Sequence, residues 1–235
     1  MEIIGYFASL LIGISLGLIG GGGSILTVPV LVYLFRVEPV LATAYSLFIV
    51  GASSLVGAVP KYKQGLVNLK TALIFGIPAI AAVFATRKFI VPQIPKEIFS
   101  VGEFIITKSI LLMVLFAVLM VFASISMIKG KKDIQEDVSK KQKFNYPMIL
   151  VEGTVVGILT GLVGAGGGFL IIPALVIFSK LPMKQAVGTS LLIIAAKSLI
   201  GFTGDLSNYI MDWKLLLTVT GLAIVGIFIG DFLSK

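Results

Sequence analysis

The sequence contains no cysteine and no histidine, and only 13% of its 235 residues are charged. Without cysteine there can be no disulfide framework, thiol nucleophile or thiolate metal site. Without histidine the commonest general base and an important zinc ligand are also missing. A catalytic site would depend on scattered serines, lysines and acids. We therefore expect a protein that is not an enzyme and that needs no cofactor and no metal ion.

Apolar residues dominate the chain. Hydrophobic residues make up 57% of it and the mean hydropathy is +1.09, whereas a soluble domain has about 45–50% apolar and about 25% charged residues. This composition predicts a lipid bilayer as the surroundings and a multi-pass membrane protein. The net charge of +8 comes from lysines and arginines that lie between apolar runs, which indicates topology signals and no nucleic-acid partner.

Charged residues divide the chain into apolar blocks at 3–35, 39–60, 71–86, 109–128, 153–179, 185–204 and 215–230. A spanning helix needs about 20 apolar residues, and backbone polar groups in hydrocarbon must be bonded internally. The pattern therefore predicts an all-α polytopic membrane protein. The blocks 3–35 and 153–179 are too long for one crossing and contain glycine clusters at 20–23 and 164–168. We expect each cluster to break a helix, giving either a re-entrant hairpin or one bent crossing.

The chain is similar to itself at an offset of 144 residues. Residues 17–29 lie over residues 161–173 with the glycines and the prolines aligned, and the register continues to Lys70 and Lys214. This predicts two homologous membrane repeats, 1–128 and 147–235, joined by a charged loop at 129–146. The counterpart of 105–128 would lie beyond residue 235, so we expect the second repeat to lack its last helix.

The positive charges favour an inverted arrangement of the repeats. If each glycine-broken block is re-entrant, twelve of the 19 lysines and arginines fall on one face and six on the other, with Lys197 in the membrane. If each block crosses once, the division is ten to eight. The positive-inside rule favours the first arrangement and places the loop 129–146 in the cytoplasm in both.

A broken membrane helix exposes backbone N–H groups and a positive dipole end where its second half begins. Such half-helix N-termini bind anions in transporters that are built from repeats. The residues that this reasoning assigns to substrate binding are Gly22, Gly23, Ser24 and Ile25, with their counterparts Gly166, Gly167, Gly168 and Phe169. Tight helix packing is the alternative role for these glycines.

Lys197 is the one charge well inside an apolar block. Ionisable residues within membrane segments are functional candidates by default, so we expect Lys197 to attract an anion or to carry a proton. A snorkelling or structurally paired lysine is the alternative. Ser46, Thr189 and Ser190 could line the path, although interhelical hydrogen bonding explains these hydroxyls equally well. Glu152 and Asp205, near the predicted membrane boundaries, are weaker candidates.

Three motifs carry a resemblance to a known family. The stretch 17–24 (GLIGGGGS) with its echo 161–168 (GLVGAGGG), the residues 188–191 (GTSL) and the residues 212–214 (DWK) resemble the TauE/SafE sulfite exporter family over essentially the whole chain. The resemblance implies a multi-pass carrier of the cell membrane for sulfite, an organosulfonate or a related anion. We therefore expect a secondary transporter, a permease or exporter, that moves a small sulfur-containing anion by alternating access. An anion channel and a non-transporting membrane scaffold or assembly factor remain the alternatives, and homo-oligomerisation is left open.

Overall fold

The computed structural model describes residues 2–101, 104–129, 146–177, 179 and 181–233, and these are mostly helical. The main helices are α1 (Glu2–Ile19), α3 (Pro39–Lys63), α4 (Leu69–Ala85), α6 (Lys108–Lys129), α7 (Tyr146–Val163), α8 (Gly168–Ile177), α9 (Met183–Thr203) and α10 (Trp213–Leu233). The predicted class, a helical polytopic membrane protein, is confirmed. The predicted loop 129–146 lies outside the described residues except for its two end residues, which are helical.

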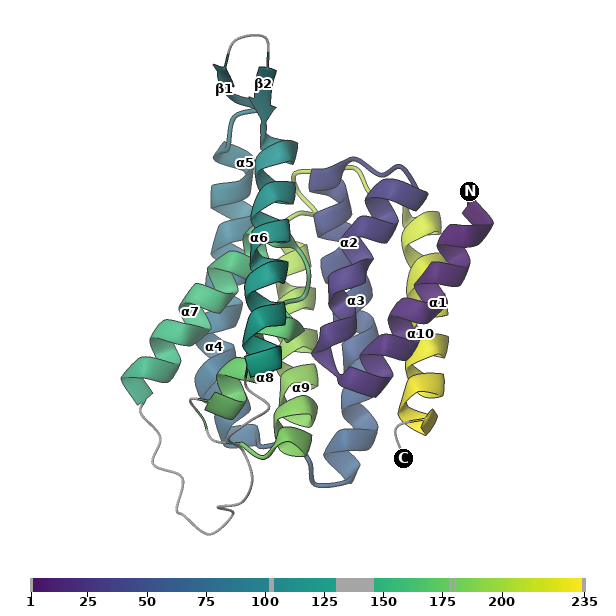
Figure 1. The fold of residues 1–235 in the computed structure, drawn as a ribbon, viewed down its shortest axis with the longest axis vertical. Helices are drawn as coiled ribbons and strands as arrows, with labels where there is room; N and C mark the ends of the chain where they lie inside the picture. The colour runs from purple at the N-terminus through teal and green to yellow at the C-terminus, as the bar shows by residue number, and fades with distance from the viewer. Residues whose placement is uncertain (1, 102–103, 130–145, 178, 180, 234–235) are drawn as a thin grey trace.

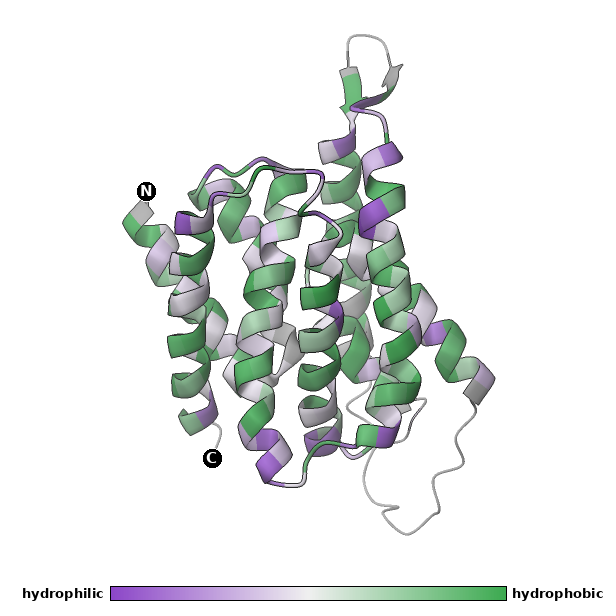
Figure 2. Ribbon diagram, turned by 180° about the vertical axis from the view of Figure 1, so that it is seen from behind, coloured by the Kyte–Doolittle hydropathy of each residue, from purple (hydrophilic) through white to green (hydrophobic). Residues whose placement is uncertain are grey.

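Four segments are long and apolar enough to cross a membrane: Pro39–Lys63, Leu69–Gln93, Met183–Thr203 and Trp213–Leu233. They match the predicted blocks 39–60, 71–86, 185–204 and 215–230. The second of them contains α4, the π-helix η3 (Thr86–Ile90) and the short α5 (Val91–Gln93). Seen from behind, hydrophobic residues colour most of the helical surface and hydrophilic residues gather toward the ends of the helices (Figure 2). This distribution is that of a protein whose sides face lipid.

Polar side chains fix where three of these helices begin. The Glu38 side chain accepts a hydrogen bond from the backbone N–H of Leu41 at the start of α3. Asn68 does the same for Thr71 at the start of α4, and Asp212 does so for Leu215 at the start of α10. Each bond satisfies one of the N–H groups that a helix leaves free in its first turn.

The two glycine-broken blocks form folded-back pairs of arms (Figure 1). α1 descends from the N-terminus to the middle of the molecule, and the segment through η1 (Gly21–Leu26), α2 (Thr27–Pro29) and η2 (Val30–Leu34) returns to the same end. α7 starts in the opposite half of the molecule. After the break, α8 returns toward that half, where α9 starts. The return arm of the first block begins as a 3₁₀ helix, whereas that of the second begins as an α-helix.

Helices that are 144 residues apart have matching bounds and matching neighbours. The helix starts pair as Glu2 with Tyr146, Pro39 with Met183, and Leu69 with Trp213. α1 packs along α10 and α7 packs along α4, while α3 and α9 pack against each other. Each folded-back pair therefore lies mainly against a helix from the other half of the chain.

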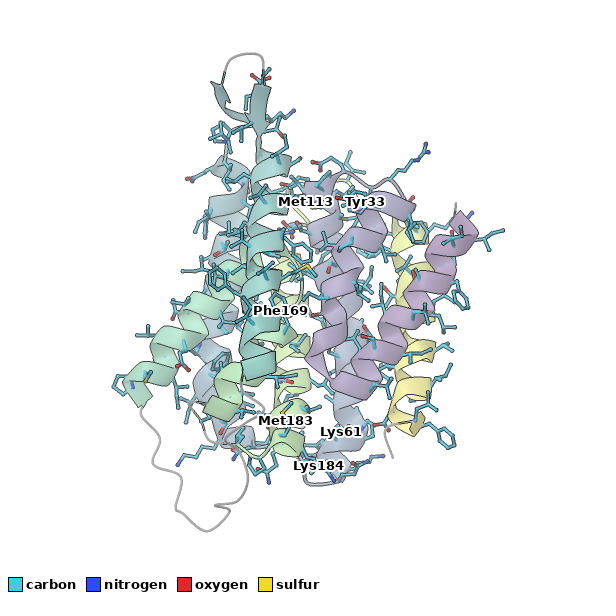
Figure 3. All side chains as sticks on the ribbon, viewed as in Figure 1. Tyr33, Lys61, Met113, Phe169, Met183 and Lys184 are labelled. Carbon is cyan, nitrogen blue, oxygen red and sulfur yellow. The ribbon has the colours of Figure 1, made fainter. Side chains whose placement is uncertain are left out.

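A two-stranded antiparallel hairpin, β1 (Glu97–Val101) and β2 (Phe104–Thr107), extends beyond the helical body (Figure 1). The all-α class that the sequence predicts did not include this hairpin. We call this end of the molecule the β end. The opposite end, where Lys61, Met183 and Lys184 are labelled in Figure 3, is called the Lys61 end.

Candidate functional site

The second glycine cluster breaks the chain between α7 and α8. Gly164, Gly166 and Gly167 all have positive φ, at 73°, 64° and 69°, a conformation that disfavours every residue with a β-carbon. A β-carbon on Gly164 would also lie 2.3 Å from Cβ of Thr43. The cluster therefore reverses the chain where a larger residue would meet both backbone strain and a close neighbour.

The first glycine cluster breaks the chain between α1 and η1. Gly20 has φ of 76°, and a β-carbon on it would lie 2.6 Å from Cγ1 of Val187. Gly23 lies against α1, since its β-carbon would be 2.5 Å from the backbone nitrogen of Leu16. Gly22 lies within η1. The chain thus resumes as a six-residue 3₁₀ helix, and its N–H groups are arranged less regularly than the predicted half-helix requires.

The two breaks lie against each other. η1 contacts α8, and a β-carbon on Gly166 would be 3.5 Å from Cβ of Ser24. Ser24 is fully buried. Residues that were selected from opposite halves of the sequence therefore share one location, as the substrate-site prediction requires.

The Lys197 side chain, from α9, reaches the start of α8. It is fully buried, its Nζ atom donates a 2.8 Å hydrogen bond to Oγ1 of Thr160 in α7, and a β-carbon on Gly167 would be 2.7 Å from Nζ. The Gly167 carbonyl accepts from the N–H groups of Leu170 and Ile171, which makes Gly167 the cap of α8. The first N–H groups of the helix, those of Gly168 and Phe169, then have no acceptor within α8.

The electrostatic contributions identified at this site are positive. Among the described residues Lys197 forms no ion pair, although an ammonium group carries three donors. The positive end of the α8 dipole points toward the same place. A buried ammonium with one neutral partner at a helix N-terminus has the electrostatics of an anion site.

The predicted hydroxyl residues divide into two groups. Thr189 accepts a 2.9 Å hydrogen bond from the backbone N–H of Asn68, and Ser190 donates a 2.8 Å bond to the Val187 carbonyl. Ser46 is fully buried, and its Oγ has no hydrogen-bond partner in the described part of the chain. The same holds for Ser198. Thr189 therefore joins α9 to the start of α4, whereas Ser46 and Ser198 have unused polar capacity.

The side chains of Ile25 and Phe169 belong to an apolar cluster that includes Val28, Val163 and Phe116. Only their backbone groups could face an anion. An apolar groove of about 520 Å³ lies beside this cluster, between η2 and α6, where Tyr33 and Met113 are labelled in Figure 3. Its lining is almost entirely apolar, so the groove suits a lipid chain and not an anion.

A buried ion pair lies near the β end. Nε of Arg87, in η3, donates to Oδ2 of Asp205 at 2.6 Å, and neither side chain is exposed. Nη1 of Arg87 also donates to Oγ1 of Thr43 at 2.9 Å and to the Gly161 carbonyl at 3.2 Å. Burial raises the pKa of Asp205 above its ordinary value, and the Arg87 guanidinium opposes that shift. The pair connects the end of the α4 segment to the turn after α9.

A second ion pair lies at the Lys61 end. Nζ of Lys61 in α3 lies 2.8 Å from Oδ1 of Asp231 in α10, and the two side chains are 15% and 17% exposed. Both ion pairs join segments from opposite halves of the chain.

The sequence reasoning did not select Thr160, Arg87, Lys61 or Asp231 for the site. Arg87 and Lys61 were counted only as topology charges at the edges of apolar blocks. Thr160 had no signal, because its counterpart at the 144-residue offset is the apolar Leu16. The charged residues had a signal, since Arg87 aligns with Asp231 and Lys61 with Asp205.

Comparison with known proteins now defines the class. The family profile described as "Sulfite exporter TauE/SafE" matches residues 6–235. Relatives named "Probable membrane transporter protein" occur in Xylella fastidiosa, with 30% identity over 95% of this chain and 81% of the relative, and in Methanocaldococcus jannaschii, with 30% identity over 86% and 73%. YdhB of Bacillus subtilis, also named a probable membrane transporter protein, is 26% identical over 94% of this chain and 85% of the relative.

The fold and these matches define a membrane-integral protein of a transporter family. The chain belongs to the TauE/SafE sulfite exporter family. No solved structure gives a significant match to it.

Proposed function

We propose that this chain is a secondary transporter of a small sulfur-containing oxyanion, built from two inverted repeats that alternate access to a shared central site. The observation that carries the proposal is the buried Lys197 ammonium, which has Thr160 as its one hydrogen-bond partner among the described residues and lies against the cap of α8. A site with two sources of positive charge, and with no carboxylate paired to Lys197 in the part of the chain that the structure describes, favours an anion over a cation or an apolar solute.

Packing at the glycines supports the repeats. Gly13 lies against Ala223, whereas Gly157 lies against Ala79. Adding 144 to the first residue of one contact, and subtracting it from the second, gives the other contact. This reciprocal pattern is the mark of a two-fold relation between halves.

Two further glycine contacts follow the same rule. Gly20 against Val187 corresponds to Gly164 against Thr43, and Gly57 against Ile227 corresponds to Gly201 against Val83. The folded-back arms start in opposite halves of the molecule and run in opposite directions (Figure 1), so the axis that relates the halves of the chain would lie in the membrane plane. That arrangement is the inverted-repeat design of many secondary transporters.

Alternating access is supported by the state of the site. Lys197, Ser24 and Ser46 are fully buried, so the described conformation is closed to both sides of the membrane. Binding and release would require the halves to move apart at one end at a time. We also propose that the Lys61 end, which carries Lys61, Lys63, Lys70 and Lys184, faces the cytoplasm of the cell, in line with the positive-inside rule.

The substrate class is supported by the family description, a sulfite exporter, together with the Lys197 ammonium and the free N–H groups at the start of α8. A sulfite ion or a sulfonate group presents three oxygens to N–H donors and an ammonium. The glycines allow so small a group to approach the backbone closely. Ser46 and Ser198 would complete the polar lining.

The test is flux into proteoliposomes from a panel of anions that includes sulfite, a short organosulfonate, sulfate, chloride and acetate. We expect saturable uptake of a sulfur oxyanion that is accelerated when the same anion is preloaded on the other side. Substitution of Lys197 by Met is expected to abolish it. Current without saturation would favour a channel, and the absence of both flux and anion-dependent thermal stabilisation across the panel would favour a scaffold.

A further inference from the structure

The ion pairs Arg87–Asp205 and Lys61–Asp231 are related by the repeat offset. Arg87 plus 144 is Asp231, and Lys61 plus 144 is Asp205. The pair Arg87–Asp205 therefore corresponds, position by position, to the pair Lys61–Asp231, with the positive and negative residues exchanged. A reciprocal contact of this kind is expected at an interface between two halves that are related by a two-fold axis.

Each pair joins the two halves of the chain at one end of the molecule. Lys61 lies in the last turn of α3 and Asp231 in the last turn of α10, at the Lys61 end. Arg87 follows α4 and Asp205 follows α9, which places their pair toward the β end. The central site with Lys197 lies between these two levels of the helical body.

We propose that these two ion pairs are the gates of the transport cycle, Lys61–Asp231 closing the route to the Lys61 end and Arg87–Asp205 closing the route to the β end. This inference rests on the proposed transport function. When the halves rock about their axis, one pair separates while the other stays closed. Both pairs are intact in the described conformation, at 2.8 Å and 2.6 Å, which agrees with the burial of the central site on both sides.

Burial argues against a purely stabilising role. A buried ion pair contributes little net stability, because the desolvation of both charges offsets their attraction. The Arg87 pair is incomplete as well, since Nη2 of Arg87 and Oδ1 of Asp205 have no hydrogen-bond partner among the described residues. η3, which carries Arg87, is a π-helix, a distortion often found at functional positions. A pair that is both buried and incompletely bonded is suited to opening.

The β-end gate is also connected to the central site. Arg87 donates to Oγ1 of Thr43. Thr43 in turn packs against Gly164 of the second glycine cluster, so closely that a β-carbon on Gly164 would overlap with it. Arg87 also donates to the Gly161 carbonyl of α7. A movement of α7 and α8 on anion binding would therefore pull directly on the partners of Arg87.

The gates can be tested without any substrate, because the chain contains no cysteine and accepts single reporter cysteines. Ser46→Cys lies one helical turn after Thr43, inside the β-end gate. Ser190→Cys is its counterpart inside the Lys61-end gate. Each is labelled from either side of the membrane with an impermeant maleimide. We expect Asp231→Asn to accelerate labelling of Ser190→Cys from the Lys61 end by about tenfold, because loss of the negative partner leaves Lys61 unpaired and lowers the population of the closed state. Asp205→Asn is expected to do the same for Ser46→Cys from the β end only.

The chain supplies its own control. Lys61→Asp combined with Asp231→Arg turns the Lys61-end gate into a copy of the β-end pair, and we expect this double variant to restore protection of Ser190→Cys. Unchanged protection in both Asn variants would overturn the proposal, as would labelling from both ends or no recovery in the double variant. The Lys61 pair is partly exposed, so Asp231→Asn can be evaluated even if Asp205→Asn does not fold. If the labelling behaves as expected but no anion is transported, the gates stand and the proposed substrate fails.

Discussion

Gly167 and Lys197 are adjacent in space although 30 positions separate them: a β-carbon on Gly167 would lie 2.7 Å from the Lys197 ammonium nitrogen. The same β-carbon would lie 2.0 Å from Cγ2 of Thr160. The glycine therefore does two things, since it allows the left-handed turn that starts α8 and leaves room for a charged group at the cap of that helix.

Gly167→Ala is expected to remove anion transport and to lower stability. The positive φ alone costs about 1–2 kcal/mol for a residue with a β-carbon, and the contact with Thr160 adds strain to that. Stability is measured by thermal unfolding in detergent, and transport by flux.

Gly65→Ala is the matched control for this substitution. Gly65 also has a positive φ, of 71°, but nothing lies within 4 Å of its β-carbon position. We expect it to show the backbone cost and to keep transport. Equal loss of transport in the two variants would contradict a specific role of Gly167 in the site.

Lys197→Met is expected to abolish anion transport while raising the unfolding temperature. Replacement of a buried charge that lacks an ion-pair partner by an apolar residue of similar volume removes the cost of desolvating that charge. A lysine kept for structure would give the opposite result, a loss of stability. Lys184→Met, at an exposed position, is the control and should change neither property.

The sequence was sufficient to predict the helical class, the positions of the spanning helices and the two chain breaks. Block length, charge spacing and glycine clusters are local signals, and the bilayer makes them strict. The location of Lys197 at the cap of α8 was not predictable, because it depends on how α7, α8 and α9 meet. Arg87 was missed for a related reason: at the end of an apolar block a paired arginine and a topology charge look alike.

The 144-residue offset also relates the residues of the two ion pairs, although it does so through positions that differ. Identical residues identify the glycines, whereas the positions of the two ion pairs carry opposite charges at the 144-residue offset and so count as mismatches. Their relation becomes visible only when the contacts of these positions are known.

Gly13→Ala and Gly157→Ala are expected to destabilise the protein by similar amounts, about 1–3 kcal/mol each. A β-carbon on Gly13 would lie 2.0 Å from the Ala223 carbonyl oxygen, and one on Gly157 would lie 2.6 Å from that of Ala79. In both cases a backbone atom, which cannot rotate away, is the obstacle. Unfolding in detergent measures the two losses.

Gly221→Ala is the control for these two substitutions. Gly221 is an exposed glycine of α10 with nothing within 4 Å of its β-carbon position. Alanine there is expected to be neutral or to stabilise the helix by up to about 1 kcal/mol. A loss at Gly13 without one at Gly157 would argue against equivalent packing of the two halves.

Labelling of single cysteines distinguishes the two topologies. Arg36→Cys, Tyr62→Cys and Lys184→Cys all replace exposed residues. If the glycine-broken blocks are re-entrant, Lys184→Cys and Tyr62→Cys react from one side of the membrane and Arg36→Cys from the other. If each block crosses once, Lys184→Cys reacts from the same side of the membrane as Arg36→Cys.

Tyr62→Cys also reports the orientation of the protein in the membrane. A cytoplasmic Lys61 end requires that Tyr62→Cys react with an impermeant maleimide only after the cells are permeabilised. Reaction of Tyr62→Cys in intact cells would reverse the proposed orientation and leave the re-entrant arrangement to be decided by Lys184→Cys alone.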